Sequence, residues 1–309
     1  MSKLIKLFKI KFYKFSIINK MKRSIILILI CFIFIININI SFSLPVALIH
    51  GFRQSCAEYD LESLEAYIGY KTGEYSKCIE TGGGSTDISR SFKDQAKKAC
   101  EIISNDDHYK GEFAIVSISQ GGVLARYVIE KCDMPGHVKV FVSIGGPLAG
   151  THQLPHCHRG VTCHILNSFA DWFVYKGYVQ NSMGPAGYFR VSNHIQNFYK
   201  SSSLLLDVNN QGKSVDPEAK RRFISLDKLV LILFERDTMI SPKESAHFGV
   251  YDEEHKVINM KDTESYKNDL FGLKTLEEAG KIIYHRVDEN HCYYNFIDMD
   301  DCVIPYVKN

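Results

Sequence analysis

Ser119 lies in a short segment whose residue types and order suit nucleophilic catalysis. Residues 117–122 read Ser-Ile-Ser-Gln-Gly-Gly, after the apolar, β-branched run Phe113–Val116 and before Val123–Glu130, where apolar residues recur at helical spacing. A strand, a tight turn that carries a serine and a helix form the arrangement called a nucleophile elbow. The first N–H groups of the helix would favour the negative charge that develops when the serine attacks a carbonyl. Ser117 stands where a glycine is usual, which we interpret as a tolerated small residue.

Asp237 and His291 occupy positions where a serine nucleophile needs its acid and its base. The base must reach the serine by a hydrogen bond, and the acid must hold the base in the right tautomer. The nearly charge-free run Leu229–Phe234 predicts a strand that ends shortly before Asp237, and Lys281–Val287 predicts one that ends shortly before His291. We therefore predict a catalytic triad of Ser119, Asp237 and His291, in that chain order.

Other acids and histidines near the predicted strands compete for the same two roles. They are Glu235, Asp288, His247, His255 and His285. The three histidines fall between predicted elements or within a strand, which suits a base less well than the end of a strand. His50 precedes the serine, so we expect it to shape a loop that supplies an oxyanion N–H. Taken alone, Asp237 would more often be a turn or capping residue and His291 a surface histidine, but their joint placement favours the triad.

The elements that must position these residues alternate along the chain. Strands are predicted at 45–49, 113–116, 138–144, 229–234 and 281–287, and helices at 58–67, 91–103, 123–130 and 273–279. This alternation predicts an α/β fold with a mostly parallel central sheet that helices cover on both faces. From about residue 149 to 224 the alternation stops. We interpret this stretch, rich in histidine, serine, asparagine and aromatic residues, as a largely helical insertion between two core strands.

The first 43 of the 309 residues have the composition of a secretory signal peptide. Met1–Arg23 holds eight basic residues and no acidic one, Ile25–Ile36 is almost wholly apolar, and small residues follow near Ser43. Met21 is a possible true start, and the alternative is a signal anchor that stays in the membrane. Without this leader the 37 basic residues lose eight and the 35 acidic residues lose none, which leaves a net charge of about −6. A nucleic-acid partner is therefore not expected, and residues 44–309 are enough for one domain with no stable membrane span.

Eight cysteines remain once Cys31 is removed with the leader. An even count in a secreted chain predicts disulfides, although spacing does not fix their connectivity. Residues 156–164 hold two cysteines and three histidines, so a zinc cluster is an alternative there to the bridge Cys157–Cys163 that we favour. Cys292 and Cys302 are a further candidate pair, and Cys56 and Cys78 stay unassigned. The mature chain has no Asn-x-Ser/Thr sequon, so N-glycosylation is not expected.

Several short segments along residues 44–309 point to a known family when they are taken together. They are Leu48-Ile49-His50-Gly51 with Ser55-Cys56, Ser119-Gln120-Gly121-Gly122, Val142-Ser143-Ile144-Gly145-Gly146, Leu154-Pro155-His156-Cys157, Asp237-Thr238 with His247-Phe248-Gly249, and Gly272-Leu273-Lys274 with Glu278-Ala279-Gly280. Through these segments the chain resembles the palmitoyl-protein thioesterases, a family of lysosomal α/β-hydrolases, and the similarity covers essentially all of residues 44–309. The chain departs from the family at Ser117, in its lack of glycosylation sites and in the short segment between Cys157 and Cys163.

The resemblance implies a specific activity and assigns its residues. Ser119 would be the nucleophile, Asp237 the orienting acid and His291 the base, and the backbone N–H groups of Phe52 and Gln120 would form the oxyanion hole. Neither a cofactor nor a metal is implied. The substrates would be S-palmitoylated proteins or peptides and acyl-CoA.

The same resemblance extends to the setting of the activity. It implies an acyl groove built partly by the insertion, a Cys100–Cys132 bridge, a monomer, and a location in the lysosome or outside the cell. A lipase or carboxylesterase that acts on oxygen esters, and a lipid-binding pseudoenzyme, are the alternative functions.

Overall fold

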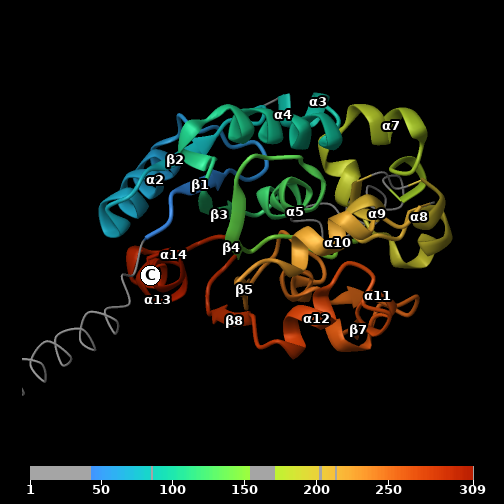
Figure 1. The fold of residues 1–309 in the computed structure, drawn as a ribbon. Coiled ribbons are helices and arrows are strands. Elements are labelled where there is room, and N and C mark those ends of the chain that lie inside the picture. Colours follow the sequence, from blue (N-terminus) through green and yellow to red (C-terminus); the bar gives the residue numbers. More distant parts are fainter. Residues whose placement is uncertain (1–42, 85, 154–170, 202–203, 213, 309) are drawn as a thin grey trace, which may run out of the picture. The chain divides into compact units, whose positions relative to one another are not determined.

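The structure, a computed structural model, describes residues 43–84, 86–153, 171–201, 204–212 and 214–308 (Figure 1). The predicted signal peptide, apart from Ser43, lies outside the described residues. So do Cys157 and Cys163, whose predicted bridge and alternative zinc cluster therefore stay predictions.

A six-stranded parallel sheet forms the centre of the molecule. Its strand order is β2-β1-β3-β4-β5-β8, and each neighbouring pair is parallel. The strands are β1 (Val46–Ile49), β2 (Ser76–Ile79), β3 (Glu112–Ile118), β4 (His137–Ile144), β5 (Lys228–Phe234) and β8 (Ile282–Val287). Two short antiparallel strands, β6 (Val250–Tyr251) and β7 (Val257–Ile258), form a separate hairpin. Because all six main strands run in one direction, their carboxyl ends meet at one edge of the sheet.

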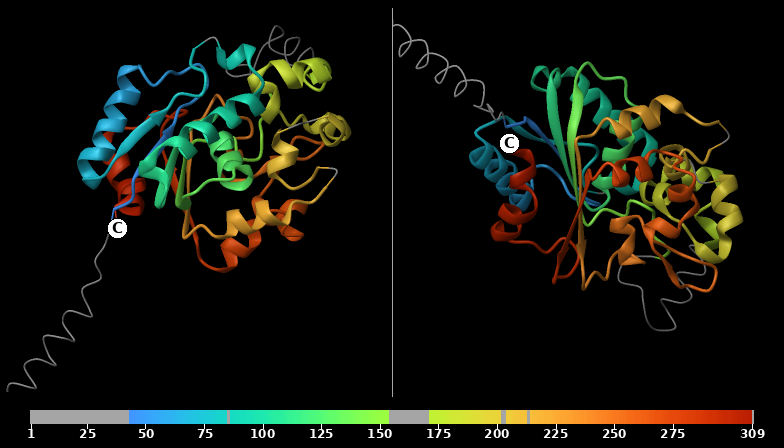
Figure 2. Two further views of the ribbon diagram at one scale, coloured as in Figure 1. Left: turned by 45° about the horizontal axis from the view of Figure 1, so that its top comes forward. Right: turned by 60° about the horizontal axis from the view of Figure 1, so that its bottom comes forward.

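Helices cover both faces of the sheet (Figure 2). Alternate residues of each strand point to opposite faces, so the sheet is shared by two apolar cores. One core holds residues of α2 (Tyr59–Thr72), α13 (Phe296–Cys302) and α14 (Ile304–Val307). The other holds residues of α4 (Phe92–Asn105), α5 (Gly121–Lys131), α9 (Leu204–Val208), α10 (Pro217–Ile224) and α12 (Leu273–Glu278).

The segment between β4 and β5 contains several short helices instead of a single crossover helix. In its described parts these are α7 (Gly177–Ser182), α8 (Ile195–Ser201), α9 and α10, with 3-10 turns at Gly184–Tyr188 and Ser192–His194. Elsewhere the chain forms α3 (Thr86–Ser89), α11 (Glu264–Lys267) and further 3-10 turns at Asp107–Tyr109, Lys243–His247 and Met260–Asp262. Tyr175, Tyr188, Phe189 and Phe198 are buried within the insertion, whereas Trp172 and Tyr178 are exposed.

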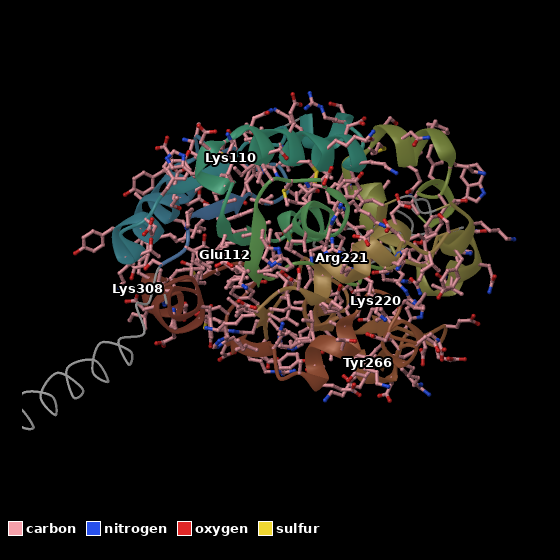
Figure 3. All side chains as sticks on the ribbon, in the orientation of Figure 1. Lys110, Glu112, Lys220, Arg221, Tyr266 and Lys308 are labelled. Carbon is pink, nitrogen blue, oxygen red and sulfur yellow. A yellow bond between two sulfur atoms is a disulfide. The ribbon has the colours of Figure 1, made fainter. Side chains whose placement is uncertain are left out.

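The predicted strands and helices are confirmed, and the architecture is the α/β-hydrolase fold expected from the sequence. The sequence pattern missed β2, because this strand is only four residues long and its first two residues are not buried. Exposed charged side chains of both signs, among them Lys110, Glu112 and Arg221, lie on the surface (Figure 3). None of the helices in the described ranges is both long and apolar enough to cross a membrane.

Two disulfides are present among the described cysteines. Cys100–Cys132 confirms the pairing implied by the family resemblance, and Cys56–Cys78 pairs the two cysteines that the sequence left unassigned. The candidate bridge Cys292–Cys302 is wrong, because both thiols are free. Cys302, the last residue of α13, is buried in the core on its face of the sheet. The Cys292 backbone instead turns at a φ of 52° and directs its sulfur to the Ile144 carbonyl, 3.5 Å away.

Candidate active site

Ser119 sits at a strained turn between β3 and α5. Its φ is 50°, which non-glycine residues seldom adopt, and its N–H donates to the Ile144 carbonyl at 2.8 Å. The two glycines that follow are required by close packing. A Cβ atom on Gly121 would lie 2.5 Å from the Ile49 carbonyl oxygen, and one on Gly122 would lie 2.9 Å from Ser143 Oγ. The backbone geometry is therefore that of the predicted nucleophile elbow.

Ser117, the departure from the usual motif, is accommodated inside β3. It is fully buried, and its hydroxyl donates to the Val142 carbonyl on the neighbouring strand at 3.2 Å. A buried hydroxyl with a hydrogen-bond partner costs little, which explains why a serine is tolerated here.

The structure brings Ser119, His291 and Asp237 together in one hydrogen-bonded line. His291 Nδ1 lies 2.6 Å from Asp237 Oδ2, and His291 Nε2 lies 2.8 Å from Ser119 Oγ. Because a carboxylate can only accept, Nδ1 carries the proton and Nε2 is left to accept from the serine hydroxyl. The second oxygen of Asp237 accepts from the N–H groups of Met239 and Ile240 at 2.7 and 2.9 Å, which fixes the carboxylate after β5.

The electrostatic surroundings strengthen His291 as a proton acceptor. Its side chain is 9% exposed, and burial alone would lower its pKa, because the charged imidazolium loses water. The Cys292 sulfur, 3.5 Å from Nε2, and the Asp237 carboxylate act in the opposite direction and raise the pKa of His291 above its usual value.

The competing acids and histidines are engaged elsewhere. Glu235 pairs with Lys243 and Arg286, which lower the pKa of its carboxyl, and Asp288 pairs with Arg236. The histidines bond to partners away from the serine: His247 to the Leu231 carbonyl, His285 to Tyr306 and His255 to His152.

The loop after β1 lies against the serine. A Cβ atom on Gly51 would be 3.3 Å from Ser119 Cβ, so the two residues are close neighbours. His50 is fully buried and donates from Nδ1 to the Gly51 carbonyl at 2.9 Å, so it holds the loop from within. Within the described parts of the chain, neither the Phe52 N–H nor the Gln120 N–H has an acceptor, so both are available to a ligand.

Sequence reasoning missed two residues beside this site, Cys292 and Glu80. Cys292 was considered only as half of a disulfide. Glu80 follows β2 just as Asp237 and His291 follow their own strands, but β2 was not recognised. The signal that could have found Glu80 is an acidic residue between a short apolar pair and the glycine run 82–84.

One cavity adjoins the site, and another touches the insertion. The larger, about 510 Å³, has Ile118 and Cys292, the chain neighbours of Ser119 and His291, in its lining, together with Leu64, Tyr294 and Phe296. A smaller cavity of about 190 Å³ touches the insertion at Ala149, Arg190, Tyr199 and Asn209. In the described part of the chain no three His, Cys, Asp or Glu side chains are grouped as a metal site requires.

Comparison with known proteins shows which family this chain is part of. The family model described as palmitoyl protein thioesterase matches residues 45–291. The chain belongs to this family. Palmitoyl-protein thioesterase 1 of Caenorhabditis elegans is 31% identical over 258 residues, 80% of this chain and 86% of the relative.

Other members of the palmitoyl protein thioesterase family match over similar spans. Lysosomal thioesterase PPT2-B of Xenopus laevis is 30% identical over 260 residues, 79% of this chain and 84% of its own. Palmitoyl-protein thioesterase 3 of Dictyostelium discoideum is 24% identical over 269 residues, 86% of this chain and 90% of the relative. The chain is thus a thioester hydrolase with an α/β-hydrolase fold.

Proposed function

We propose that this chain removes long-chain acyl groups from S-acylated cysteines, with Ser119 as nucleophile, His291 as base and Asp237 as the acid that orients it. The observation that carries the proposal is the hydrogen-bonded line from Asp237 through His291 to Ser119. The family membership supports the thioester as the bond that is cleaved.

In the first half of the reaction, Ser119 Oγ attacks the thioester carbonyl while His291 Nε2 takes its proton. The tetrahedral oxyanion is stabilised by the N–H groups of Phe52 and Gln120 and by the start of α5. The C–S bond then breaks, and His291 returns the proton to the departing sulfur. Asp237 keeps the imidazole in the required tautomer and offsets its charge.

In the second half, water replaces the thiol beside His291. The base takes a proton from the water, whose oxygen attacks the acyl-serine carbonyl through the same oxyanion site. As this second tetrahedral intermediate collapses, the bond between the acyl carbon and Ser119 Oγ breaks and His291 returns the proton to Oγ, which releases the fatty acid and restores both residues. Because a thiolate leaves readily, protonation of the leaving group is less demanding than in amide cleavage.

The proposal extends to substrates and location. Acyl-CoA presents the same thioester and is proposed as a second substrate, acted on by a monomer without cofactor or metal. The relative from Xenopus laevis is named a lysosomal thioesterase. We propose that the basic and apolar leader directs this chain into the secretory pathway, toward the lysosome or the cell exterior.

The deciding experiment separates recognition of the substrate's acyl chain from recognition of the group to which that acyl chain is attached. Purified protein is given an S-palmitoyl peptide, palmitoyl-CoA, their octanoyl counterparts and trioleoylglycerol, with Ser119→Ala as the inactive control. Eight fewer buried methylenes remove at most about 6 kcal/mol, at about 0.8 kcal/mol each. The palmitoyl thioesters should therefore be cleaved far faster, and trioleoylglycerol poorly.

Two outcomes would contradict this function. Robust triacylglycerol hydrolysis with indifference to S-palmitoyl peptides would assign the chain as a lipase. Tight binding of palmitoyl peptides without turnover would assign it as a pseudoenzyme that binds lipids.

A further inference from the structure

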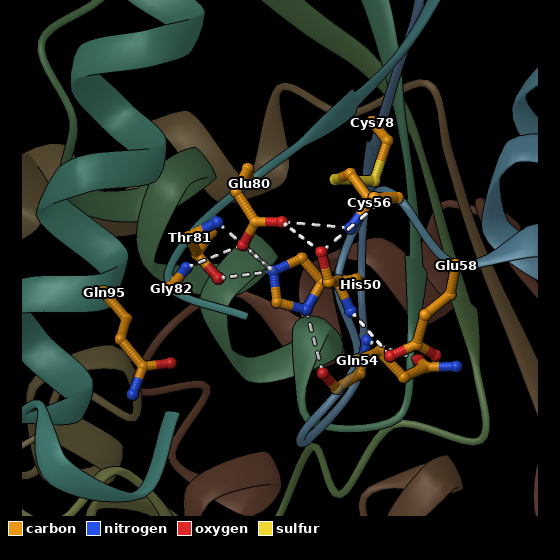
Figure 4. Close-up of polar contacts among 12 residues, drawn as sticks. His50, Gln54, Cys56, Glu58, Cys78, Glu80, Thr81, Gly82 and Gln95 are labelled. Carbon is orange, nitrogen blue, oxygen red and sulfur yellow. Dashed lines mark hydrogen bonds and ion pairs between the residues drawn. A yellow bond between two sulfur atoms is a disulfide. The ribbon is translucent and has the colours of Figure 1, made fainter. Parts of the chain in front are cut away.

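The Glu80 carboxylate ties together three segments on the loop side of Ser119 (Figure 4). Its Oε2 accepts from Ser55 Oγ and from the Cys56 N–H, both at 3.0 Å. Its Oε1 accepts from the Gly82 N–H at 3.1 Å and lies 3.3 Å from His50 Nε2. One side chain at the end of β2 therefore contacts the end of β1, the loop that follows β1 and the glycine run that follows β2.

The carboxylate suits this role because it is held in its ionised form. Burial would raise the pKa of Glu80, but the N–H groups of Cys56 and Gly82 and the nearby His50 lower it to below the usual value. Two oxygens that only accept can satisfy several donors at once, which a neutral side chain of the same shape cannot do.

The same loop is held by further hydrogen bonds and by close packing. The Gly51 N–H donates to Gln54 Oε1 at 2.8 Å, and the Gly84 N–H donates to the Gln54 carbonyl at 3.3 Å. A Cβ atom on Gly83 would lie 2.9 Å from Glu80 Oε1 and 3.2 Å from Ser55 Cβ. The glycine run thus packs directly on the carboxylate and on the loop.

Cys56 is held twice, by its N–H on Glu80 and by its disulfide to Cys78 on β2. Between this anchor and the end of β1 lies Phe52, whose N–H has no acceptor among the residues that the structure describes. An N–H that stabilises an oxyanion must be oriented before the charge forms, because reorienting it during the reaction would cost free energy.

We propose that Glu80 is a positioning residue that fixes the loop carrying the Phe52 N–H against Ser119, and thereby stabilises the oxyanion of the transition state. This inference rests on the proposed function. Glu80 touches no reacting atom and acts through the loop. Because the oxyanion exists only in the transition state and the intermediates beside it, a displaced loop lowers kcat and leaves substrate binding nearly unchanged.

The test compares Glu80→Gln and Glu80→Ala with the wild-type chain. Glutamine keeps the shape but turns one acceptor into a donor, so either the Ser55 and Cys56 bonds or the Gly82 bond is lost. We expect kcat for an S-palmitoyl peptide to fall about tenfold in Glu80→Gln and about a hundredfold in Glu80→Ala. The first decrease is smaller than the loss of kcat caused by removing one oxyanion donor, and the second is similar to it. KM should change less than about threefold.

A second measurement separates an effect on oxyanion stabilisation from an effect on the fold. A long-chain trifluoromethyl ketone forms a tetrahedral adduct with the serine, and its affinity should fall in parallel with kcat. Binding of the uncleaved palmitoyl peptide, measured in a Ser119→Ala background, should stay within about threefold. Thermal unfolding of each variant reports whether the fold is kept.

Glu65→Gln is the matched control, because Glu65 accepts the Cys78 N–H of β2 at 2.7 Å and makes no hydrogen bond to the loop. It should keep wild-type kcat. If Glu80→Ala does not fold, Glu80→Gln decides the question.

The positioning role is overturned if Glu80→Gln keeps wild-type kcat and wild-type affinity for the ketone, or if its loss lies wholly in KM. A wild-type chain that does not cleave the S-palmitoyl peptide would instead refute the proposed function, so the two failures are distinguishable.

Discussion

The two sides of Ser119 are built in different ways. On one side, His291 and Asp237 are side chains that follow β8 and β5, and they meet the serine in a single hydrogen-bonded line. On the other side, the groups proposed to act are backbone N–H groups, one of them in a loop held by Glu80 and by the bridge Cys56–Cys78. The first side depends on which residues are present, and the second depends on where the backbone is held.

The largest expected effect is a loss of activity that distinguishes Asp237, the proposed acid, from the nearby carboxylates. Asp237→Asn should lower kcat about 10⁴-fold, because an amide would favour the wrong tautomer of His291. Glu235→Gln and Asp288→Asn are the matched controls and should stay near wild-type activity, since both carboxylates pair with cations away from the histidine. If Asp237→Asn kept a kcat close to wild type while one of the controls lost most of its activity, the orienting acid would be the residue changed in that control.

A smaller effect is expected from removing the disulfides, and only one of the two should affect kcat. Removing either bridge as a double Cys→Ala variant should cost about 3 kcal/mol of unfolding free energy, because the closed loops span 22 and 32 residues. Loss of Cys56–Cys78 should also lower kcat about tenfold, since it releases the proposed oxyanion loop. Loss of Cys100–Cys132 should not.

Chemical denaturation and steady-state kinetics on the two double variants check this expectation. Equal kcat values in the two variants, after correction for the folded fraction, would show that the bridge to Cys78 does not position the loop.

The smallest expected effect is a shift in the pH profile. The proposed base works in its neutral form, so kcat/KM falls as the pH drops below the pKa of His291. Cys292 contributes to raising that pKa. Cys292→Ala should therefore lower the pKa and move the acidic limb of the profile to lower pH.

Cys302→Ala is the control, since Cys302 is a free thiol at the end of α13 that packs in the core against the sheet, and it has no described contact with His291. Its acidic limb should match the wild type. If the acidic limb of the Cys292→Ala profile stays in place or moves to higher pH, Cys292 does not raise the pKa of His291, and Asp237 alone does.

The sequence was sufficient to predict that Ser119, Asp237 and His291 lie together, as the structure shows. Each follows an apolar run long enough to be recognised as a strand, and parallel strands bring their carboxyl ends to one edge. The close packing of the two glycines after Ser119 also follows from the sequence motif, and the structure leaves no space there for a Cβ atom. Local pattern and parallel topology together fix these positions.

The loop side was decided only by the tertiary structure. The short strand β2 has no clear pattern, so its register beside β1, which brings Glu80 to the loop and Cys78 to Cys56, could not be read from the chain. Likewise, the sequence offers Cys302 as a candidate partner for Cys292, but a left-handed backbone turn directs the Cys292 sulfur to the Ile144 carbonyl. Periodicity reports which residues are buried, whereas the partner of a loop atom depends on contacts between segments distant in sequence, and these arise only when the chain is folded.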